Sequence, residues 1–182
     1  VLPLATAQPS LDLLAIAARL PQPETGIGLR SPQEAHLRFG ARWRVLRSRA
    51  FGGGEGLARL ALSAEFAGEA QDWPLHPALL DMATGWAMPL VPGYAADHLW
   101  VPLSYARVQV WQALPADVLS WVRLAPGAKD GEARFDITLA APDGTVCVEI
   151  AGFAMHRLEG GLTLTPPDPR TVTFDAVAEA PG

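Results

Sequence analysis

The chain has 182 residues, of which 49% are hydrophobic and 18% charged, with a formal net charge of -5. This composition is typical of one compact globular domain, and the acidic balance without a basic cluster argues against nucleic acid as a partner, because nucleic-acid binding neutralises phosphates. The single cysteine, Cys147, excludes an internal disulfide, no Cys/His set has the spacing of a zinc site, and no apolar run has membrane-spanning length, so we expect a cytoplasmic protein.

The N-terminal part of the chain predicts two short helices joined by a linker. Ser10 is a capping residue before helix-like apolar spacing that extends to Leu20. Proline and glycine are frequent in the following residues up to Gly28, which indicates a linker. At Ser31 a second set of helix-start signals begins, with a proline and a glutamate in the first turn, and this helix is expected to end near Gly40.

A glycine-rich segment, residues 52–56, separates two predicted strands at residues 43–51 and 57–64. Because the residues after the glycines have the pattern of a strand, the segment predicts a hairpin, whereas a phosphate-binding glycine loop would lead into a helix. Four arginines in and beside the first strand are interpreted as a solvated strand edge or, alternatively, as a patch for an acidic carrier protein. They are Arg42, Arg44, Arg47 and Arg49.

The most informative segment is the sequence Leu-His-Pro-Ala-Leu-Leu-Asp at residues 75–81, which opens an almost wholly apolar run. The run predicts a buried helix from Pro77 to about residue 90, and proline suits its first turn, where a missing N–H costs nothing. Asp81 lies too far inside this helix to cap it. A buried carboxylate without partners tends to take up a proton, so we expect Asp81 to be a buried acid that can donate one.

Two residues of this segment also have plainer interpretations. His76, just before a proline at the helix start, is expected to be a capping or hydrogen-bonding residue. Asp81 could be a structural aspartate that bonds to the backbone of the next strand. From position alone, both alternatives remain open.

The C-terminal half predicts an antiparallel sheet. Alternation of apolar and polar residues, as from Arg134 to Leu139, is typical of half-buried antiparallel strands. Strands are predicted at residues 100–111, 118–125, 133–140 and 145–158. One long apolar helix among about six strands indicates an α+β fold in which a curved antiparallel sheet wraps around a central helix. The proline-rich residues beyond Gly160 are expected to be a linker or tail.

Four segments resemble, in the same order, elements of the dehydratase domains of polyketide synthases. The hexapeptide His-Pro-Ala-Leu-Leu-Asp at residues 76–81 resembles the signature of the second half of these domains. Three weaker matches are Phe39-Gly40-Ala41-Arg42-Trp43, Val101-Pro102-Leu103-Ser104-Tyr105 and Ala141-Pro142-Asp143-Gly144-Thr145. The resemblance implies a hotdog fold at residues 31–158, the second half of a double hotdog, with residues 1–30 as an N-terminal segment and residues 159–182 as a tail.

The resemblance also implies a reaction and its participants. Domains of this family remove water from a β-hydroxyacyl chain carried on the phosphopantetheine of an acyl carrier protein, and they need no other cofactor. Asp81 would protonate the departing hydroxyl, and a histidine of the first half would remove the α-hydrogen. The implied partners are the carrier protein, the first hotdog half, other synthase domains and a second copy in a homodimer. The implied substrate-binding residues are His76, Pro77, Phe39, Gly40, Gly85, Leu103 and Tyr105.

The sequence departs from the family where the base should be. None of its four histidines lies in a His-x-x-x-Gly-x-x-x-x-Pro motif, so the chain alone is predicted not to dehydrate. Phe39 stands where the family has tyrosine, Ala41 where it has proline, and Gly85 where it usually has Gln or His, one helical turn after Asp81. Three hypotheses remain: a dehydratase fragment that contributes Asp81 to a composite site, a dehydratase-like cyclase or isomerase, and a non-catalytic hotdog that holds a synthase together or receives a carrier protein.

Overall fold

The computed structural model of the chain describes residues 7–127 and 129–159, so most of the predicted tail lies outside the described residues. The described residues build one antiparallel sheet, whose strands follow the order β1-β2-β3-β6-β7-β8-β4, with β5 also paired to β8. The strands are β1 (Glu24–Thr25), β2 (Leu46–Gly52), β3 (Glu55–Ala61), β4 (Trp100–Ser104), β5 (Arg107–Val110), β6 (Asp117–Leu124), β7 (Glu132–Ala140) and β8 (Val146–Arg157). The predicted antiparallel strands and the hotdog architecture are confirmed.

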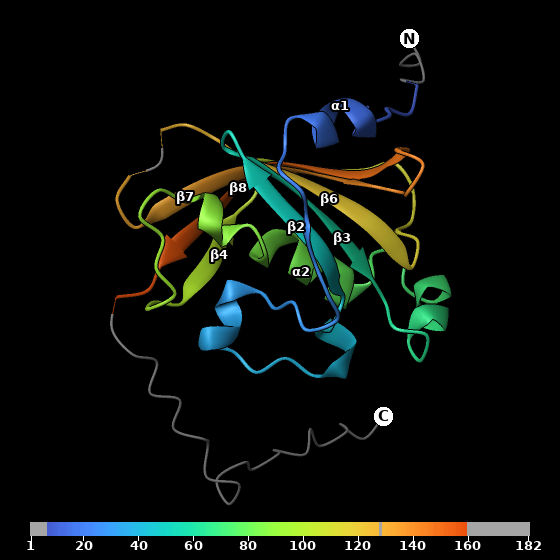
Figure 1. Cartoon of the computed structure of the whole chain (residues 1–182), viewed down its shortest axis with the longest axis horizontal. Helices are drawn as coiled ribbons and strands as arrows, with labels where there is room; N and C mark the ends of the chain where they lie inside the picture. The colour runs from blue at the N-terminus through green and yellow to red at the C-terminus, as the bar shows by residue number, and fades with distance from the viewer. Residues whose placement is uncertain (1–6, 128, 160–182) are drawn as a thin grey trace, which may run out of the picture.

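The helix α2 (Pro77–Gly85) packs against the sheet, which curves around it (Figure 1). Its buried residues are Ala78, Leu79, Met82 and Ala83. Complete burial of a side chain such as Leu79 contributes about 1.5–3 kcal/mol to folding. The helix is shorter than predicted, because it ends at Gly85 and a separate 3-10 turn, η4 (Met88–Leu90), follows at Pro89, which cannot continue a helix.

The core between α2 and the sheet contains one polar bridge. The indole of Trp86, the residue after α2, donates to Ser120 Oγ at 3.0 Å, and the same hydroxyl donates to the carbonyl of Ala83 at 3.5 Å. Both Trp86 and Ser120 are fully buried. The bridge satisfies the polar atoms where β6 crosses the end of the helix.

The N-terminal elements differ from the prediction in detail. The first helix is α1 (Leu13–Ala18), capped by Asp12 and not by Ser10, because Ser10 instead forms a β-bridge with Thr145. The predicted second helix is reduced to a 3-10 turn, η1 (Pro32–Ala35), although its capping box is present as predicted. Two further turns, η2 (Ala41–Trp43) and η3 (Ala67–Gln71), complete the helical elements.

Glycines decide two features of the sheet. Gly53 and Gly54, with φ of 59° and 79°, form the two-residue turn between β2 and β3, the geometry of a type I′ hairpin, so the hairpin interpretation is confirmed. The predicted strand at residues 100–111 is split into β4 and β5 opposite Gly152. That glycine has a φ of 61°, and a Cβ there would lie 2.8 Å from the Cβ of Ala106.

The described residues contain neither a membrane-spanning helix nor a cluster of metal ligands. None of the helices between residues 7 and 159 has the length and apolarity needed to cross a bilayer. The described side chains also form no group of three or more potential metal ligands.

Candidate active site

Asp81 lies in the middle of α2 with an exposed carboxylate. We predicted a buried carboxylate at this position. In the chain by itself the carboxylate is exposed, so that prediction is wrong. Its Oδ2 accepts a hydrogen bond of 2.7 Å from the indole Nε1 of Trp43. That partner is a side chain, not the backbone of the next strand that the structural alternative proposed.

Helical geometry explains the exposure. Pro77, Asp81 and Thr84 are spaced three or four residues apart and lie on the side of α2 that faces away from the sheet. Ala78, Leu79, Met82 and Ala83 form the buried side. An apolar run alone does not reveal which of its positions lies on the outer side of the helix.

Trp43 comes from η2, which begins after Gly40 and contacts α2. The ring of Trp43 is partly buried against the hydrophobic core and stacks on Phe39, with ring centroids 6.4 Å apart and planes at 10°. The matched motif at residues 39–43 therefore lies beside the acid. From the sequence we assigned Trp43 no hydrogen-bonding role; its position in that motif, together with the missing side chain at Gly85, is the signal that points to one.

His76 holds the start of α2. Its side chain is only 2% exposed, and its Nδ1 accepts the backbone N–H of Ala78 at 3.3 Å. Because Nδ1 is an acceptor, the ring proton is assigned to Nε2, which donates to Glu69 Oε2 at 3.1 Å. The predicted capping role of His76 is confirmed.

Glu69 connects this histidine to η2. Its carboxylate also forms an ion pair with Arg42 at 2.8 Å. The hydrogen bonds from Arg42 and then from His76 lower the pKa of Glu69 from 4.5 to about 2. A charged network of Arg42, Glu69 and His76 therefore ties η2 and η3 to the N-terminus of the helix that carries Asp81.

The other predicted substrate-binding residues lie in two places. Pro77 and Gly85 are the first and last residues of α2, the helix that carries Asp81, and Gly40 precedes η2. Phe39 stacks on Trp43, whose indole binds the Asp81 carboxylate. Leu103 and Tyr105 belong to the edge of the sheet, in and just after β4. Both are strongly exposed, and the ring of Tyr105 stacks on Phe153 of β8.

Three further histidines have partners or positions of their own. His36 contacts the carbonyl of Ala96 at 3.1 Å, and His98 pairs with Asp97 at 2.8 Å. His156 lies in β8, in register with Glu132 of β7. Within the described residues, no histidine is a hydrogen-bond partner of the Asp81 carboxylate, so a base for an acid–base pair is not found in this part of the chain.

The arginines around β2 are largely paired with acids. Arg42 pairs with Glu69, Arg44 with Glu34 and Arg49 with Glu24. Arg47 donates to the carbonyl of Arg44 at 2.7 Å, and burial lowers its pKa. Three of the four charges are therefore paired with acids inside the chain, which disfavours the alternative of a patch for a carrier protein.

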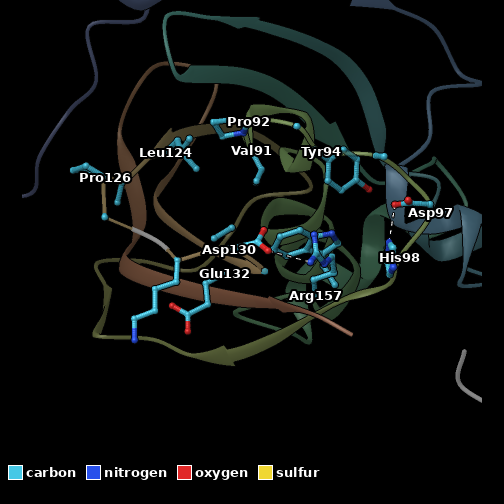
Figure 2. Close-up of a pocket in the computed structure, with 18 residues that line it drawn as sticks. Val91, Pro92, Tyr94, Asp97, His98, Leu124, Pro126, Asp130, Glu132 and Arg157 are labelled. Atoms are coloured by element: carbon cyan, nitrogen blue, oxygen red, sulfur yellow. Dashed lines mark ion pairs between the residues drawn. The ribbon is translucent and has the colours of Figure 1, made fainter. Parts of the chain in front are cut away.

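A cavity of about 560 Å³ lies away from the acid, between the loop after α2 and the turn between β6 and β7 (Figure 2). Tyr94, Asp97, His98 and Arg157 are among its lining residues, and Asp81 is not. Burial raises the pKa of Tyr94, whose hydroxyl has no hydrogen-bond partner among the described residues. This cavity and the candidate acid are therefore separate features.

Comparison with known proteins identifies a family. Residues 12–164 match the model of the family described as "Polyketide synthase dehydratase N-terminal domain". The polyketide synthase PksM of Bacillus subtilis is 29% identical over 111 residues, which are 57% of this chain and 3% of PksM. PksN of the same organism is 27% identical over 107 residues, 58% of this chain and 2% of PksN.

Solved structures agree on the fold. The dehydratase domain from the CurF module of the curacin polyketide synthase has a TM-score of 0.73 and 23% identity, over 86% of this chain and 55% of the solved one. A trans-AT polyketide synthase dehydratase domain from Brevibacillus brevis has a TM-score of 0.69 and 25% identity, over 85% of this chain and 55% of that one. The chain thus spans about half of each solved domain and a few per cent of each synthase. From its family match and its fold, the chain belongs to the polyketide synthase dehydratase family.

Proposed function

We propose that the chain is the second hotdog half of a polyketide synthase dehydratase domain and that it supplies Asp81 as the general acid. The observation that carries the proposal is the exposed Asp81 carboxylate on the outer side of the central helix, held by the Trp43 indole at 2.7 Å. An acid at that place is accessible to a substrate that lies between this half and another. The substrate is a β-hydroxyacyl thioester on the phosphopantetheine of an acyl carrier protein.

In this reaction the chain supplies the general acid, and the first half supplies the general base. A histidine of the first half removes the α-hydrogen, whose electron pair forms the Cα–Cβ double bond as the Cβ–O bond breaks. Asp81 gives its proton to the departing hydroxyl, which leaves as water, because hydroxide is a poor leaving group. The products are an α,β-unsaturated thioester and a carboxylate on Asp81, which regains the proton now held by the histidine before the next turnover.

Four observations support the assignment to the second half, although the matching family is described as an N-terminal domain. The motif at residues 76–81 carries the aspartate of the second half, and the histidine motif of the first half is absent from the sequence. The chain also spans 55% of the solved CurF domain. In addition, exposed apolar side chains gather at the β4–β5 edge of the sheet, which is the kind of surface that a neighbouring unit covers. They are Leu103, Tyr105, Val108 and Val110.

The partners follow from this assignment. The first hotdog half completes the site, the acyl carrier protein delivers the substrate, and the other domains of a dimeric synthase surround both. The cyclase or isomerase and the non-catalytic hotdog have no observation of their own in their favour.

The decisive experiment compares Asp81→Asn with the parent in a complete domain, made by joining this chain to its first half. We expect the variant to lose dehydration by about 10²–10⁴-fold, because an amide cannot supply the proton. Asp72→Asn, at an exposed position beside η3, is the matched control and should keep parental turnover. The isolated chain should leave the substrate unchanged. Near-parental turnover of a folded Asp81→Asn domain would show that the acid is another group.

A further inference from the structure

The Asp81 carboxylate has a donor that comes from a distant part of the sequence and is itself held in place. Trp43 lies 38 residues before Asp81, and its Nε1 is 2.7 Å from Oδ2. The ring is fixed by packing against the core and by stacking on Phe39. A hydrogen bond from a packed ring restricts the carboxylate more than one from a flexible side chain would.

The helix itself offers no comparable donor on this side. Gly85, four residues after Asp81 and therefore its neighbour on the helix surface, has no side chain. The hydroxyl of Thr84 donates to the backbone carbonyl of Asp81 at 2.9 Å and not to the carboxylate. Among the described residues, Trp43 is the one whose side chain donates to the carboxylate of Asp81.

An indole nitrogen can only donate a hydrogen bond. In a neutral carboxylic acid the carbonyl oxygen is the stronger acceptor, so the indole bond to Oδ2 favours the proton of a neutral Asp81 on the other oxygen, Oδ1. We propose that Trp43 is a positioning residue for Asp81: it binds Oδ2 and thereby makes Oδ1 the oxygen that holds and delivers the proton. This inference rests on the proposed function for its catalytic consequence, whereas the hydrogen bond itself can be tested without turnover.

The chain provides a matched control for this interaction. Trp121, on β6, donates its Nε1 to Glu55 Oε2 at 2.7 Å. Its neighbour Ser120 points into the core beside α2, so Trp121 lies on the opposite face of the sheet. Trp121→Phe therefore removes the same kind of hydrogen bond at a place remote from the acid.

The first test uses the isolated chain and two-dimensional NMR of the indole N–H groups. The sequence has 6 tryptophans, and the signal that disappears in Trp43→Phe identifies Trp43. In Asp81→Asn at neutral pH that signal should move upfield, because a carboxylate is a stronger acceptor than an amide, while the Trp121 signal should stay. An unmoved Trp43 signal in a folded Asp81→Asn chain would overturn the inference.

The second test uses the complete domain and separates kcat from KM. Trp43→Phe should lower kcat by about 10-fold or more with KM nearly unchanged, because a misplaced acid affects the transition state more than binding. Trp121→Phe should keep parental kcat. Adding Gly85→Gln to Trp43→Phe should recover part of the loss, since an amide donor four residues after Asp81 can reach its carboxylate.

The outcomes distinguish the two proposals. If Asp81→Asn abolishes turnover while Trp43→Phe keeps parental kcat, the assignment of Asp81 as the general acid is supported and the positioning role of Trp43 is wrong. If Trp43→Phe lowers kcat and the melting temperature together and Gly85→Gln restores neither, Trp43 is a packing residue and the positioning role is again wrong. If Asp81→Asn retains turnover, the proposed function fails, and the NMR experiment still decides whether the hydrogen bond exists.

Discussion

At the residue scale, Glu69 shows how a single carboxylate can organise the surroundings of the candidate acid without touching it. It accepts hydrogen bonds from Arg42 and His76, which belong to η2 and to the N-cap of α2. Both donors favour the ionised form of Glu69, which is why its pKa falls to about 2. Neutralising Glu69 would therefore weaken two links at once, one to η2 and one to the N-terminus of α2.

Glu69→Gln should destabilise the chain at neutral pH. The folded-state pKa of Glu69 lies below its ordinary value of 4.5, so the stabilisation is fully present above pH 4.5 and is lost as the pH falls toward about 2. The difference in unfolding free energy between parent and variant should therefore shrink across this window, as measured by urea unfolding at several pH values. Glu65→Gln, at a nearby exposed position, should stay within about 0.5 kcal/mol of the parent. A difference for Glu69→Gln that does not change with pH would contradict the network.

At the scale of elements, a glycine at the end of α2 and a glycine of the sheet beside it have opposite surroundings. A Cβ at Gly85 would meet only Ser31 Oγ, at 3.7 Å, so this glycine is not required for close packing. A Cβ at Gly56 in β3 would lie 2.9 Å from the ring atoms of both Phe51 and Trp86. The sheet approaches the end of the helix so closely that β3 tolerates no side chain there.

We therefore expect Gly85→Ala to stabilise the chain by about 0.4–1 kcal/mol, because alanine reduces the entropy of the unfolded state. Gly56→Ala should destabilise it by about 1–3 kcal/mol, since Phe51 and Trp86 must move. Thermal unfolding of both variants gives the comparison. A loss of stability in Gly85→Ala would mean that packing, and not chemistry, keeps glycine at that position.

The same elements show what could be predicted from sequence. Alternation located β6, β7 and β8 within two residues, and the paired glycines located the β2–β3 turn, because these signals are local. The apolar run predicted α2 but not its outer side, where Asp81 lies, since exposure depends on which helical face meets the sheet. The bond from Trp43 was missed because its two partners are 38 residues apart in the chain and only the fold brings them together.

At the scale of the whole molecule, one edge of the sheet carries apolar side chains that no other part of the described chain covers. Leu103 is 61% exposed and Val108 is 47% exposed. Both lie on strands that pair only with β8 and so leave one side of their backbone free. An edge of this kind invites pairing with another unit.

Val108→Arg should leave the isolated chain within about 0.5 kcal/mol of its parental stability, because the position is exposed. The same variant should weaken the association with the first hotdog half, measured by sedimentation of the mixed chains. Leu14→Arg, at a position of α1 where Leu14 is 85% exposed, is the control and should associate normally. Normal association of Val108→Arg would place the first half on another surface.

The pairing of β3 with β6, which are distant in the sequence, determines the order in which parts of the molecule can fold. These strands pair from Glu55 with Arg123 to Ala61 with Asp117, so their contact closes a loop that contains all of α2. The β2–β3 hairpin and the successive pairs β6–β7 and β7–β8 are local in sequence and can form early, whereas closing the long loop is entropically costly and slow. The helix gains its buried surface only in that closing step. Hydrogen exchange of the α2 amides should therefore share one opening free energy with the β3–β6 pair, and Asp81 acquires its position in the last cooperative event of folding.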